Sequence, residues 1–287
     1  MSINIADYNS ENAFTWCPGC GNFALQVSLR KALAELNISP SETFIAFDIG
    51  CNGNAADKIN TYAFKGLHGR AIALATGAHL ANRKFTVFAD IGDGGCFHEG
   101  LDHLVHAIRS NYNITILIHN NENFALTTGQ ATITTKKEKP MYGLPFGIPE
   151  RNLNISNFIL NLHPSFYART YSGDPVQMTQ IIKEAVQNQG CSVIEIMQLC
   201  PSYNKEFTPQ WATENMKKTE ELEKYTPTSF EDAQNLLKKD STYTGIIFRD
   251  SNIPTFYDSS QSRKNSLTEL TEEVKEYNIK KLLTYFK

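Results

Sequence analysis

The sequence has almost no excess of charge of either sign. Its 27 Lys and Arg residues and 30 Asp and Glu residues leave a formal charge of -3 at pH 7. This balance offers no basic footprint for a nucleic acid or an anionic membrane. No window approaches the ~18 apolar residues of a membrane span, and the first residues, MSINIADYNSENAFTW, lack both the basic and the apolar region of a signal peptide. We therefore expect a cytoplasmic protein with no nucleic-acid or membrane partner.

Disulfide bonds are not expected either. A cytoplasmic compartment keeps thiols reduced, so the six cysteines are candidates for metal binding or catalysis. The remaining composition, with 41% hydrophobic and 20% charged residues, is ordinary for a globular protein. A chain of 287 residues can form one large α/β domain, or one domain with an extension.

The stretch from residue 85 to residue 130 has the pattern of a strand, a glycine turn, a helix, a second strand and a polar turn. The apolar run FTVFADI ends at GDGG, apolar residues spaced three or four apart follow from Leu101, and ITILIH comes next. The strands of such a βαβ unit lie parallel and adjacent. Asp93 and the pair Asn120 and Asn121 should therefore emerge at one edge of the sheet, where folds of this class bind ligands.

These two turns suit a diphosphate held by a magnesium ion. The glycines at 92, 94 and 95 let backbone N-H groups approach a phosphate, and the N-terminus of the following helix favours an anion. Asp93 and the amide oxygen of Asn121 are hard oxygen ligands of the kind that Mg²⁺ prefers. A glycine-rich turn alone is as often a plain turn as a binding site. The pair of oxygen ligands at the same edge of the sheet favours a binding site.

Strands and helices alternate along most of the remaining chain, as a doubly wound parallel sheet requires. We expect strands at residues 43–49, 165–172 and 191–199 and helices at 23–36, 71–82, 155–162 and 175–188. After residue 204 the chain is richer in Lys, Glu and Thr, with expected helices at 219–225, 230–238 and 267–285 and a strand at 243–248. The sequence thus predicts an α/β domain over 1–204 and a C-terminal extension over 205–287 that packs on the domain or on a partner.

Four cysteines lie at turns. Cys17 and Cys20 belong to CPGCG, Cys51 follows the strand at 43–49, and Cys200 follows the strand at 191–199. If these turns meet at one edge of the sheet, four thiolates could hold either a [4Fe-4S] cluster or a tetrahedral zinc ion, and the residues alone leave both open. The other two cysteines, at 96 and 191, are expected to be small buried side chains.

The GDG turn followed by an asparagine turn resembles the thiamine diphosphate motif. The longer series CPGCG, IGC, HGR, GDG, NNENFALTTGQ and LCP, between Trp16 and about Tyr203, resembles the β subunit of the 2-oxoacid:ferredoxin oxidoreductases. The resemblance implies a doubly wound sheet of the thiamine diphosphate-binding type. It also implies an enzyme that oxidatively decarboxylates a 2-oxoacid, with pyruvate or 2-oxoglutarate as the expected substrate and coenzyme A as the acyl acceptor.

The resemblance further implies the residues of the site. Mg²⁺ would be bound by Asp93, Asn121 and the backbone carbonyl of Asn123, and a [4Fe-4S] cluster by Cys17, Cys20, Cys51 and Cys200. Positions that match those near thiamine diphosphate are Ile49, Gly50, Cys51, Asn52, His68, Gly94, Gly95, Ala125 and Leu126. An α subunit would supply the glutamate that assists the cofactor, and ferredoxin would take the electrons.

Several other residues have competing interpretations. His68 in HGR could be structural, but we favour a catalytic role near the diphosphate or the substrate, whereas Arg70 is expected to be structural. Helical spacing of histidines 98, 103 and 106 suggests zinc, yet no partner stands at a known spacing, so we expect surface or packing residues. The lysines at 136, 137 and 139 are expected to lie in a solvated loop.

Two positions depart from the family pattern. Asn54 stands where many members have a lysine or arginine, so the substrate carboxylate would be bound differently, by Lys58 or a partner residue, or the preferred oxoacid differs. Gly95 replaces a second aspartate that is common after GDG. Two alternatives to the redox enzyme are a non-redox thiamine diphosphate decarboxylase or synthase subunit, which has no use for four cysteines, and an iron-sulfur or zinc module without catalysis.

Overall fold

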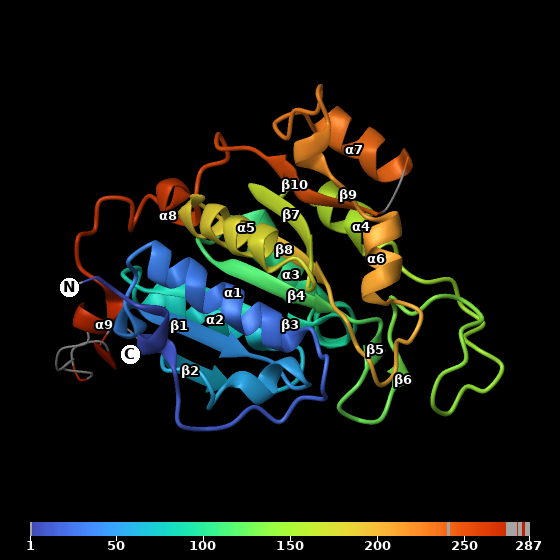
Figure 1. Ribbon diagram of the computed structural model, residues 1–287. Helices are drawn as coiled ribbons and strands as arrows, with labels where there is room; N and C mark the ends of the chain where they lie inside the picture. Colours follow the sequence, from blue (N-terminus) through green and yellow to red (C-terminus); the bar gives the residue numbers. More distant parts are fainter. Residues whose placement is uncertain (1, 240–241, 274–279, 281–282, 285–287) are drawn as a thin grey trace.

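The chain is built around one eight-stranded sheet with the strand order β2-β1-β3-β4-β8-β7-β10-β9. The computed structural model describes residues 2–239, 242–273, 280, 283 and 284 (Figure 1). The strands are β1 Thr43–Phe47, β2 Tyr62–Lys65, β3 Thr86–Gly92, β4 Thr115–Asn120, β7 Phe166–Tyr171, β8 Ser192–Met197, β9 Lys217–Lys218 and β10 Tyr243–Arg249. A separate short hairpin pairs β5, Asn123–Phe124, with β6, Gln130–Ala131.

The sheet is parallel from β2 to β7, and β10 pairs antiparallel with β7. This mixed order agrees with the doubly wound α/β fold predicted from the sequence. The β3-α3-β4 unit is as expected, since β3 and β4 are parallel neighbours with Gly92 opposite His119. The buried strands are rich in Ile, Val and Phe because both of their faces are covered by helices.

Helices cover both faces of the sheet (Figure 1). They are α1 Asn22–Glu35, α2 Ala71–Ala81, α3 Leu101–Ser110, α4 Ile155–Asn161, α5 Pro175–Gln187, α6 Pro209–Asn215, α7 Phe230–Lys239, α8 Phe256–Ser259 and α9 Leu270–Glu273. Leucines of α1 and isoleucines of α5 form one core with Phe47 and Phe88, while α2, α3, α4 and α7 form the other with Val87 and Ala89. Alternate residues of a strand point to opposite faces, so Phe88 and its neighbours enter different cores.

The segment after residue 204 completes the sheet rather than standing apart from it. β10 lies against β7, and Ala233, Leu236 and Leu237 of α7 join the core on that side. The helix expected at 230–238 and the strand expected at 243–248 are confirmed as α7 and β10. Of the helix expected at 267–285, α9 is described, whereas 274–279, 281–282 and 285 lie outside the described residues.

The helix expected at 219–225 is wrong. Only Thr219–Glu221 form a single 3₁₀ turn, after which the chain is irregular. Leu222 and Tyr225 pack against the core, and the Tyr225 hydroxyl donates a hydrogen bond to the Ile247 carbonyl. These tertiary contacts outweigh the helix propensity of a Glu- and Lys-rich segment.

Buried His79 on α2 should make the protein less stable in mild acid. Burial lowers its pKa from 6.5 to about 4, so the folded protein keeps the ring neutral where the unfolded chain binds a proton. The free energy of unfolding should therefore fall as pH drops from about 6.5 to about 4, by up to about 3 kcal/mol. When the free energy of unfolding is measured by urea titration at several pH values in this range, the His79→Leu variant should lose this part of the pH dependence. His106 is exposed, so the His106→Leu control should keep the pH dependence of the wild type. An unchanged pH dependence in His79→Leu would contradict the low pKa of His79.

Candidate active site

Four adjacent strands, β1, β3, β4 and β8, end at the same edge of the sheet. Their ends lead into the turns at residues 48–51, 93–95, 121–123 and 198–200, and a cavity opens between them. The cavity lining includes every residue expected to touch thiamine diphosphate or its metal ion: Ile49, Gly50, Cys51, Asn52, His68, Asp93, Gly94, Gly95, Asn121, Asn123, Ala125 and Leu126. It also includes Gly92, one of the three glycines of the predicted turn, and four residues that the sequence did not single out, His119, Phe124, Thr127 and Gln198.

The two glycines after Asp93 allow a close approach of three segments. A Cβ atom built on Gly94 would lie 2.1 Å from the Phe124 ring, and one built on Gly95 would lie 1.9 Å from Asp48 Oδ2. Phe124 and Asp48 could not hold these positions beside larger residues. Both positions therefore require glycine, and the backbone of this turn lines the cavity where the diphosphate is predicted to bind.

Gly95→Ala should damage the site while leaving most of the fold intact. The new methyl group collides with the carboxylate of Asp48 and lies 3.2 Å from His68 Cε1, so both must shift. We expect thiamine diphosphate affinity to fall by roughly ten-fold or more, as when residues supporting a metal site are disturbed. Gly77→Ala in α2 is the matched control, because nothing lies within 4 Å of its new Cβ. Calorimetric titration of both variants checks this, and equal affinities would contradict it.

Asp93 is a buried carboxylate whose charge lacks a cationic partner. Its side chain accepts hydrogen bonds from Thr132 Oγ1 at 2.6 Å and Thr134 Oγ1 at 2.5 Å. Burial raises its pKa from 3.8 to about 6, despite these two donors. Among the residues that the structure describes, no lysine or arginine forms an ion pair with it. A divalent cation would compensate this charge, so the chemistry of the residue fits a metal ligand.

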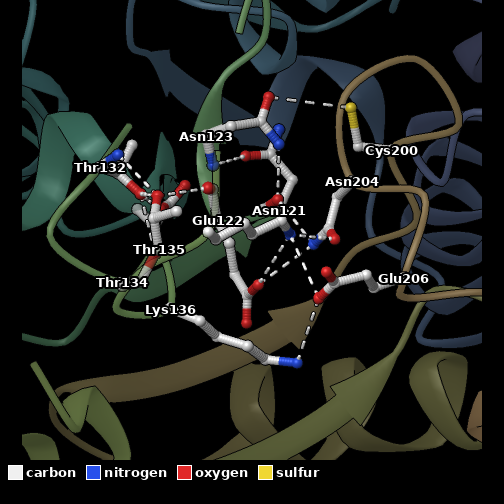
Figure 2. Close-up of polar contacts among 12 residues, drawn as sticks. Asn121, Glu122, Asn123, Thr132, Thr134, Thr135, Lys136, Cys200, Asn204 and Glu206 are labelled. Atoms are coloured by element: carbon white, nitrogen blue, oxygen red, sulfur yellow. Dashed lines mark hydrogen bonds and ion pairs between the residues drawn. The ribbon is translucent and has the colours of Figure 1, made fainter. Parts of the chain in front are cut away.

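Asn121 and Asn123 lie on the neighbouring turn, with Glu122 between them (Figure 2). Asn121 Oδ1 accepts a hydrogen bond from the Asn123 backbone N-H at 3.1 Å, and Asn123 Nδ2 donates to the Asn121 carbonyl at 2.7 Å. Both side chains are buried at the cavity. Carboxylate, amide and carbonyl oxygens are thus gathered from the ends of β3 and β4, which is a donor set that Mg²⁺ accepts.

His68 is held by two carboxylates. Its Nδ1 lies 3.1 Å from Oδ2 of the fully buried Asp48, and its Nε2 lies 3.5 Å from Glu99 Oε2. Asp48 Oδ1 also accepts a hydrogen bond from the Gly69 N-H at 2.6 Å. Burial raises the Asp48 pKa, although His68 opposes that shift. The imidazole is thereby oriented at the cavity wall. Sequence reasoning missed Asp48, whose only signal is an acidic residue inside the apolar run TFIAFDI.

A second histidine, His119, lies deeper at the end of β4 and was also missed. Its Nε2 is 3.1 Å from Asp90 Oδ1, and its Nδ1 is 2.8 Å from Gln198 Oε1 and 3.0 Å from Asn22 Oδ1. Burial alone would lower the His119 pKa, but Asp90 and the hydrogen bonds outweigh burial and the pKa is raised. Gln198 also donates to Cys20 Sγ at 3.8 Å, so this polar group links the cavity to the cysteines.

The four cysteines expected to hold a cluster come from three turns that pack together. The CPGCG turn lies against the segment after β8, since Gly21 N-H binds the Leu199 carbonyl at 3.0 Å and Ser202 Oγ lies 3.2 Å from Cys17 Sγ. Burial, followed by the thiols of Cys20, Cys200 and Cys17, raises the pKa of Cys51 to about 12. The other three thiols thus lie near enough to Cys51 to raise its pKa, and cysteine sulfurs are the ligand type of an iron-sulfur cluster.

The ligand set itself stays a prediction. Across the described part of the chain, no group of three or more His, Cys, Asp or Glu side chains is arranged so that it could hold a metal ion. Cys17 is exposed, Cys20 and Cys51 are half-buried, and Cys200 is buried. The remaining two cysteines, Cys96 and Cys191, are buried, as expected.

One expectation about surrounding residues changes, and two lysines near Asn54 can be placed. Lys139 does not lie in solvent with Lys136 and Lys137, because its side chain is only 8% exposed and contacts buried polar groups. Lys58 is paired with Asp57. The lysine beside Asn54 is instead Lys65, whose Nζ is 3.4 Å from Asn54 Oδ1.

Two residues beside the turn have structural contacts. His98 Nε2 accepts a hydrogen bond from the Ile133 N-H at 2.9 Å, which attaches the loop after β6 to the turn. Arg70 donates a hydrogen bond to the Glu99 carbonyl, in keeping with a structural role. Each contact adjoins the cavity lining, because the His98 ring lies 5.5 Å from the Phe124 ring and Glu99 lies 3.5 Å from His68 Nε2.

Known proteins resemble this chain over the same region. The family model of the thiamine pyrophosphate enzyme C-terminal binding domain matches residues 48–196, and that of the C-terminal part of the pyruvate ferredoxin oxidoreductase β chain matches residues 200–265. A 2-oxoacid:ferredoxin oxidoreductase β subunit from Aeropyrum pernix is 34% identical over 79% of this chain and 71% of its own length. The 2-oxoglutarate oxidoreductase subunit KorB from Mycobacterium tuberculosis is 34% identical over 69% of this chain and 53% of its own.

A solved structure extends the likeness to nearly the whole chain. The 2-oxoglutarate:ferredoxin oxidoreductase from Magnetococcus marinus, with 2-oxoglutarate, coenzyme A and succinyl-CoA bound, matches with a TM-score of 0.88 at 29% identity, over 99% of this chain and 96% of that one. The fold is thus confirmed as the thiamine diphosphate-binding type. Within the described residues, no helix is both long and apolar enough to cross a membrane. Sequence, fold and site agree, and the chain belongs to the β subunits of the 2-oxoacid:ferredoxin oxidoreductases.

Proposed function

We propose that the chain binds Mg²⁺ and thiamine diphosphate at the cavity and a [4Fe-4S] cluster beside it. With an α subunit, it would oxidise pyruvate or 2-oxoglutarate to the acyl-coenzyme A and CO2, and ferredoxin would accept the electrons. The observation that carries the proposal is the position of Cys51, which lines the cavity and also interacts with the other three thiols. A cytoplasmic location, residues 1–204 as the cofactor-binding domain, and residues 205–287 as its extension complete the proposal.

The residues of the cavity have distinct tasks in this scheme. Asp93, Asn121 and the Asn123 carbonyl would hold the metal ion and with it the diphosphate, while Gly94 and Gly95 keep the approach open. Thiamine diphosphate, when bound, supplies the electron sink that decarboxylation of a 2-oxoacid needs. Asp48 fixes the orientation of His68, so that the imidazole can hydrogen-bond to the diphosphate or the substrate.

The cysteines define the route for electrons. A [4Fe-4S] cluster, when bound by Cys17, Cys20, Cys51 and Cys200, accepts electrons one at a time. Because Ile49, Gly50 and Cys51 belong to one turn, a cofactor against Ile49 and a cluster on Cys51 would be neighbours. A non-redox decarboxylase would not need this arrangement, and a metal-binding module without catalysis would not need the cavity. Membership of the oxidoreductase family is consistent with both features.

The oxoacid is the least constrained part of the proposal. Relatives are described as acting on 2-oxoacids or 2-oxoglutarate. In this chain Asn54 is uncharged, but Lys65 Nζ lies beside it and offers a cation near the turn at 52–55. A second carboxylate, as in 2-oxoglutarate, could be bound by this lysine or by a residue of the α subunit.

Steady-state activity of the anaerobically purified αβ complex tests the proposal. Reduction of ferredoxin should require a 2-oxoacid, coenzyme A, thiamine diphosphate and Mg²⁺. A comparison of kcat/KM for pyruvate and for 2-oxoglutarate identifies the preferred substrate. The same protein should contain about four irons per β subunit. A colourless zinc protein, or decarboxylation that reduces no acceptor, would overturn the proposal.

A further inference from the structure

Lys139 is a buried cation in a segment that otherwise faces solvent. Its ammonium donates a hydrogen bond to Asn204 Oδ1 at 2.6 Å and lies 3.8 Å from Glu122 Oε2. Glu206, at 3.9 Å, is a weaker partner because its side chain is 61% exposed. Taking an ammonium out of water costs free energy unless fixed partners compensate it. The contacts of Lys139 with Asn204 and Glu122 are therefore a defined structural link and not a chance surface pair.

Asn204 connects this lysine to both halves of the proposed cofactor site. Its Nδ2 donates to the Asn121 carbonyl and to Glu122 Oε2, each at 3.2 Å, while its backbone N-H binds the Cys200 carbonyl at 3.0 Å (Figure 2). The side chain is almost fully buried. Asn204 thus uses its amide group on the turn at 121–123 and its backbone on the turn that begins at Cys200.

The turn at 121–123 needs such support. Glu122 has a φ of 59°, in the left-handed region that non-glycine residues rarely adopt. Its carbonyl accepts a hydrogen bond from Thr135 Oγ1 at 2.6 Å, and its carboxylate is held by Asn204 and Lys139. On the other side of the turn, Cys200 Sγ lies 3.9 Å from Asn123 Oδ1. The two turns therefore touch at several points, and the polar contacts around Lys139 form their outer edge.

We propose that Lys139 is a positioning residue that, through Asn204 and Glu122, holds the metal-binding turn at 121–123 in register with the turn that carries Cys200. This inference rests on the proposed function, because it assumes that these turns bind Mg²⁺ and the cluster. Lys139 contacts neither group itself. Its loss removes the ammonium from Asn204 Oδ1 and from the Glu122 carboxylate, which then has, among the described residues, only the Asn204 amide as a close partner. The strained turn can then move away from the geometry that Asn121 and Asn123 must keep.

The test compares Mg²⁺ binding in αβ complexes that carry Lys139→Met or Lys137→Met. Methionine keeps most of the aliphatic stem and removes the charge, and Lys137 is a matched control because its side chain is 55% exposed and pairs only weakly with Glu138. Titration of Mg²⁺ in the presence of thiamine diphosphate, followed by circular dichroism, should show about ten-fold weaker binding in Lys139→Met. The Lys137→Met control should bind Mg²⁺ with the affinity of the wild type. At saturating Mg²⁺, kcat should return most of the way to the wild-type value.

A second comparison separates positioning from a general loss of stability. Asn204→Ala should weaken Mg²⁺ binding similarly, and the double variant with Lys139→Met should lose little more, because both act through one set of contacts. Additive losses would overturn the link. Unchanged Mg²⁺ affinity in Lys139→Met, with normal binding in the wild type, would overturn the role of Lys139 alone. No Mg²⁺-dependent binding of thiamine diphosphate in the wild type would instead overturn the proposed cofactor site.

Discussion

Asp93→Ala is expected to abolish thiamine diphosphate binding, with an affinity loss of at least ~100-fold, because it removes the only ionised ligand proposed for the metal ion. The carboxylate is buried at the end of β3, and the described groups that compensate its charge are uncharged hydrogen-bond donors: two threonine hydroxyls and the Gly94 backbone N-H. Without that charge, neither Asn121 nor the Asn123 carbonyl can hold a divalent cation strongly. Calorimetric titration with Mg²⁺ and thiamine diphosphate measures the loss.

Asp93→Asn separates binding from folding. Burial raises the Asp93 pKa to about 6 in the folded protein, against 3.8 unperturbed, so at neutral pH the charged carboxylate lowers the free energy of unfolding of the apoprotein by about 3 kcal/mol. That cost appears as pH rises from about 4 through about 6. The asparagine removes it, so apo Asp93→Asn should unfold at the same or a higher temperature while still failing to bind. Exposed Asp102→Asn is the control, and wild-type affinity in Asp93→Asn would refute the assignment.

Cys51→Ala is expected to remove the cluster almost completely. Cys51 interacts with the other three thiols and is the one that also lines the cofactor cavity. A [4Fe-4S] cluster with three protein ligands and a small apolar residue in the fourth position is open to loss of iron. We expect iron to fall from about four per β subunit to below about one, with loss of the brown colour and of ferredoxin reduction.

Cys191→Ala is the matched control for this loss. Like Cys51, Cys191 is a free cysteine, but its side chain is fully buried. It precedes β8, at the end of that strand opposite the cavity, and packs in the core with Val193 and Tyr167. Its substitution should cost some stability through the small void it leaves and should leave the iron content unchanged. Iron retained in Cys51→Ala, or lost equally in both variants, would contradict the cluster assignment.

The parts of the fold that the sequence predicted are those with strong periodicity. The β3-α3-β4 unit was recognised because an apolar strand, an amphipathic helix and a second apolar strand follow one another between two turn signals. β2 was missed, because Tyr62–Lys65 is a short edge strand with mostly exposed side chains inside a polar, glycine-containing stretch. Residues 219–225 have helical composition, but the packing of Tyr225 and Leu222 prevents a helix.

Some residues of the site could likewise be predicted from the sequence and others could not. Asp93, Asn121 and the cysteines stand at turns, where polar residues are visible against apolar strands. Asp48 and His119 were missed because they lie at the ends of buried strands, where a single polar residue has no partner in the local sequence. The pairing of β2 with β1 brings His68 to Asp48, and the pairing of β3 with β4 brings Asp90 to His119.

The burial of Lys139 was not predicted from the sequence for a related reason. In the sequence it is one of three lysines in a polar connection with several prolines, and only the contact with Asn204, 65 residues away, removes it from solvent. The distance along the chain hides every such link, whereas the topology that creates it follows from the apolar pattern of the strands.

If the cofactor cavity and the cysteines form one electron-transfer unit, electrons from a 2-oxoacid must reach the cluster within a single turnover, and a single-turnover experiment tests this most directly. The anaerobic αβ complex, loaded with Mg²⁺ and thiamine diphosphate, is mixed with the 2-oxoacid identified by kcat/KM and frozen for electron paramagnetic resonance. The wild type should show the signal of a reduced [4Fe-4S] cluster, and this signal should be absent from Asp93→Asn and from Cys51→Ala. A loaded wild-type complex that consumes the oxoacid with its cluster still oxidised, or a reduced-cluster signal that persists in Cys51→Ala, would contradict it.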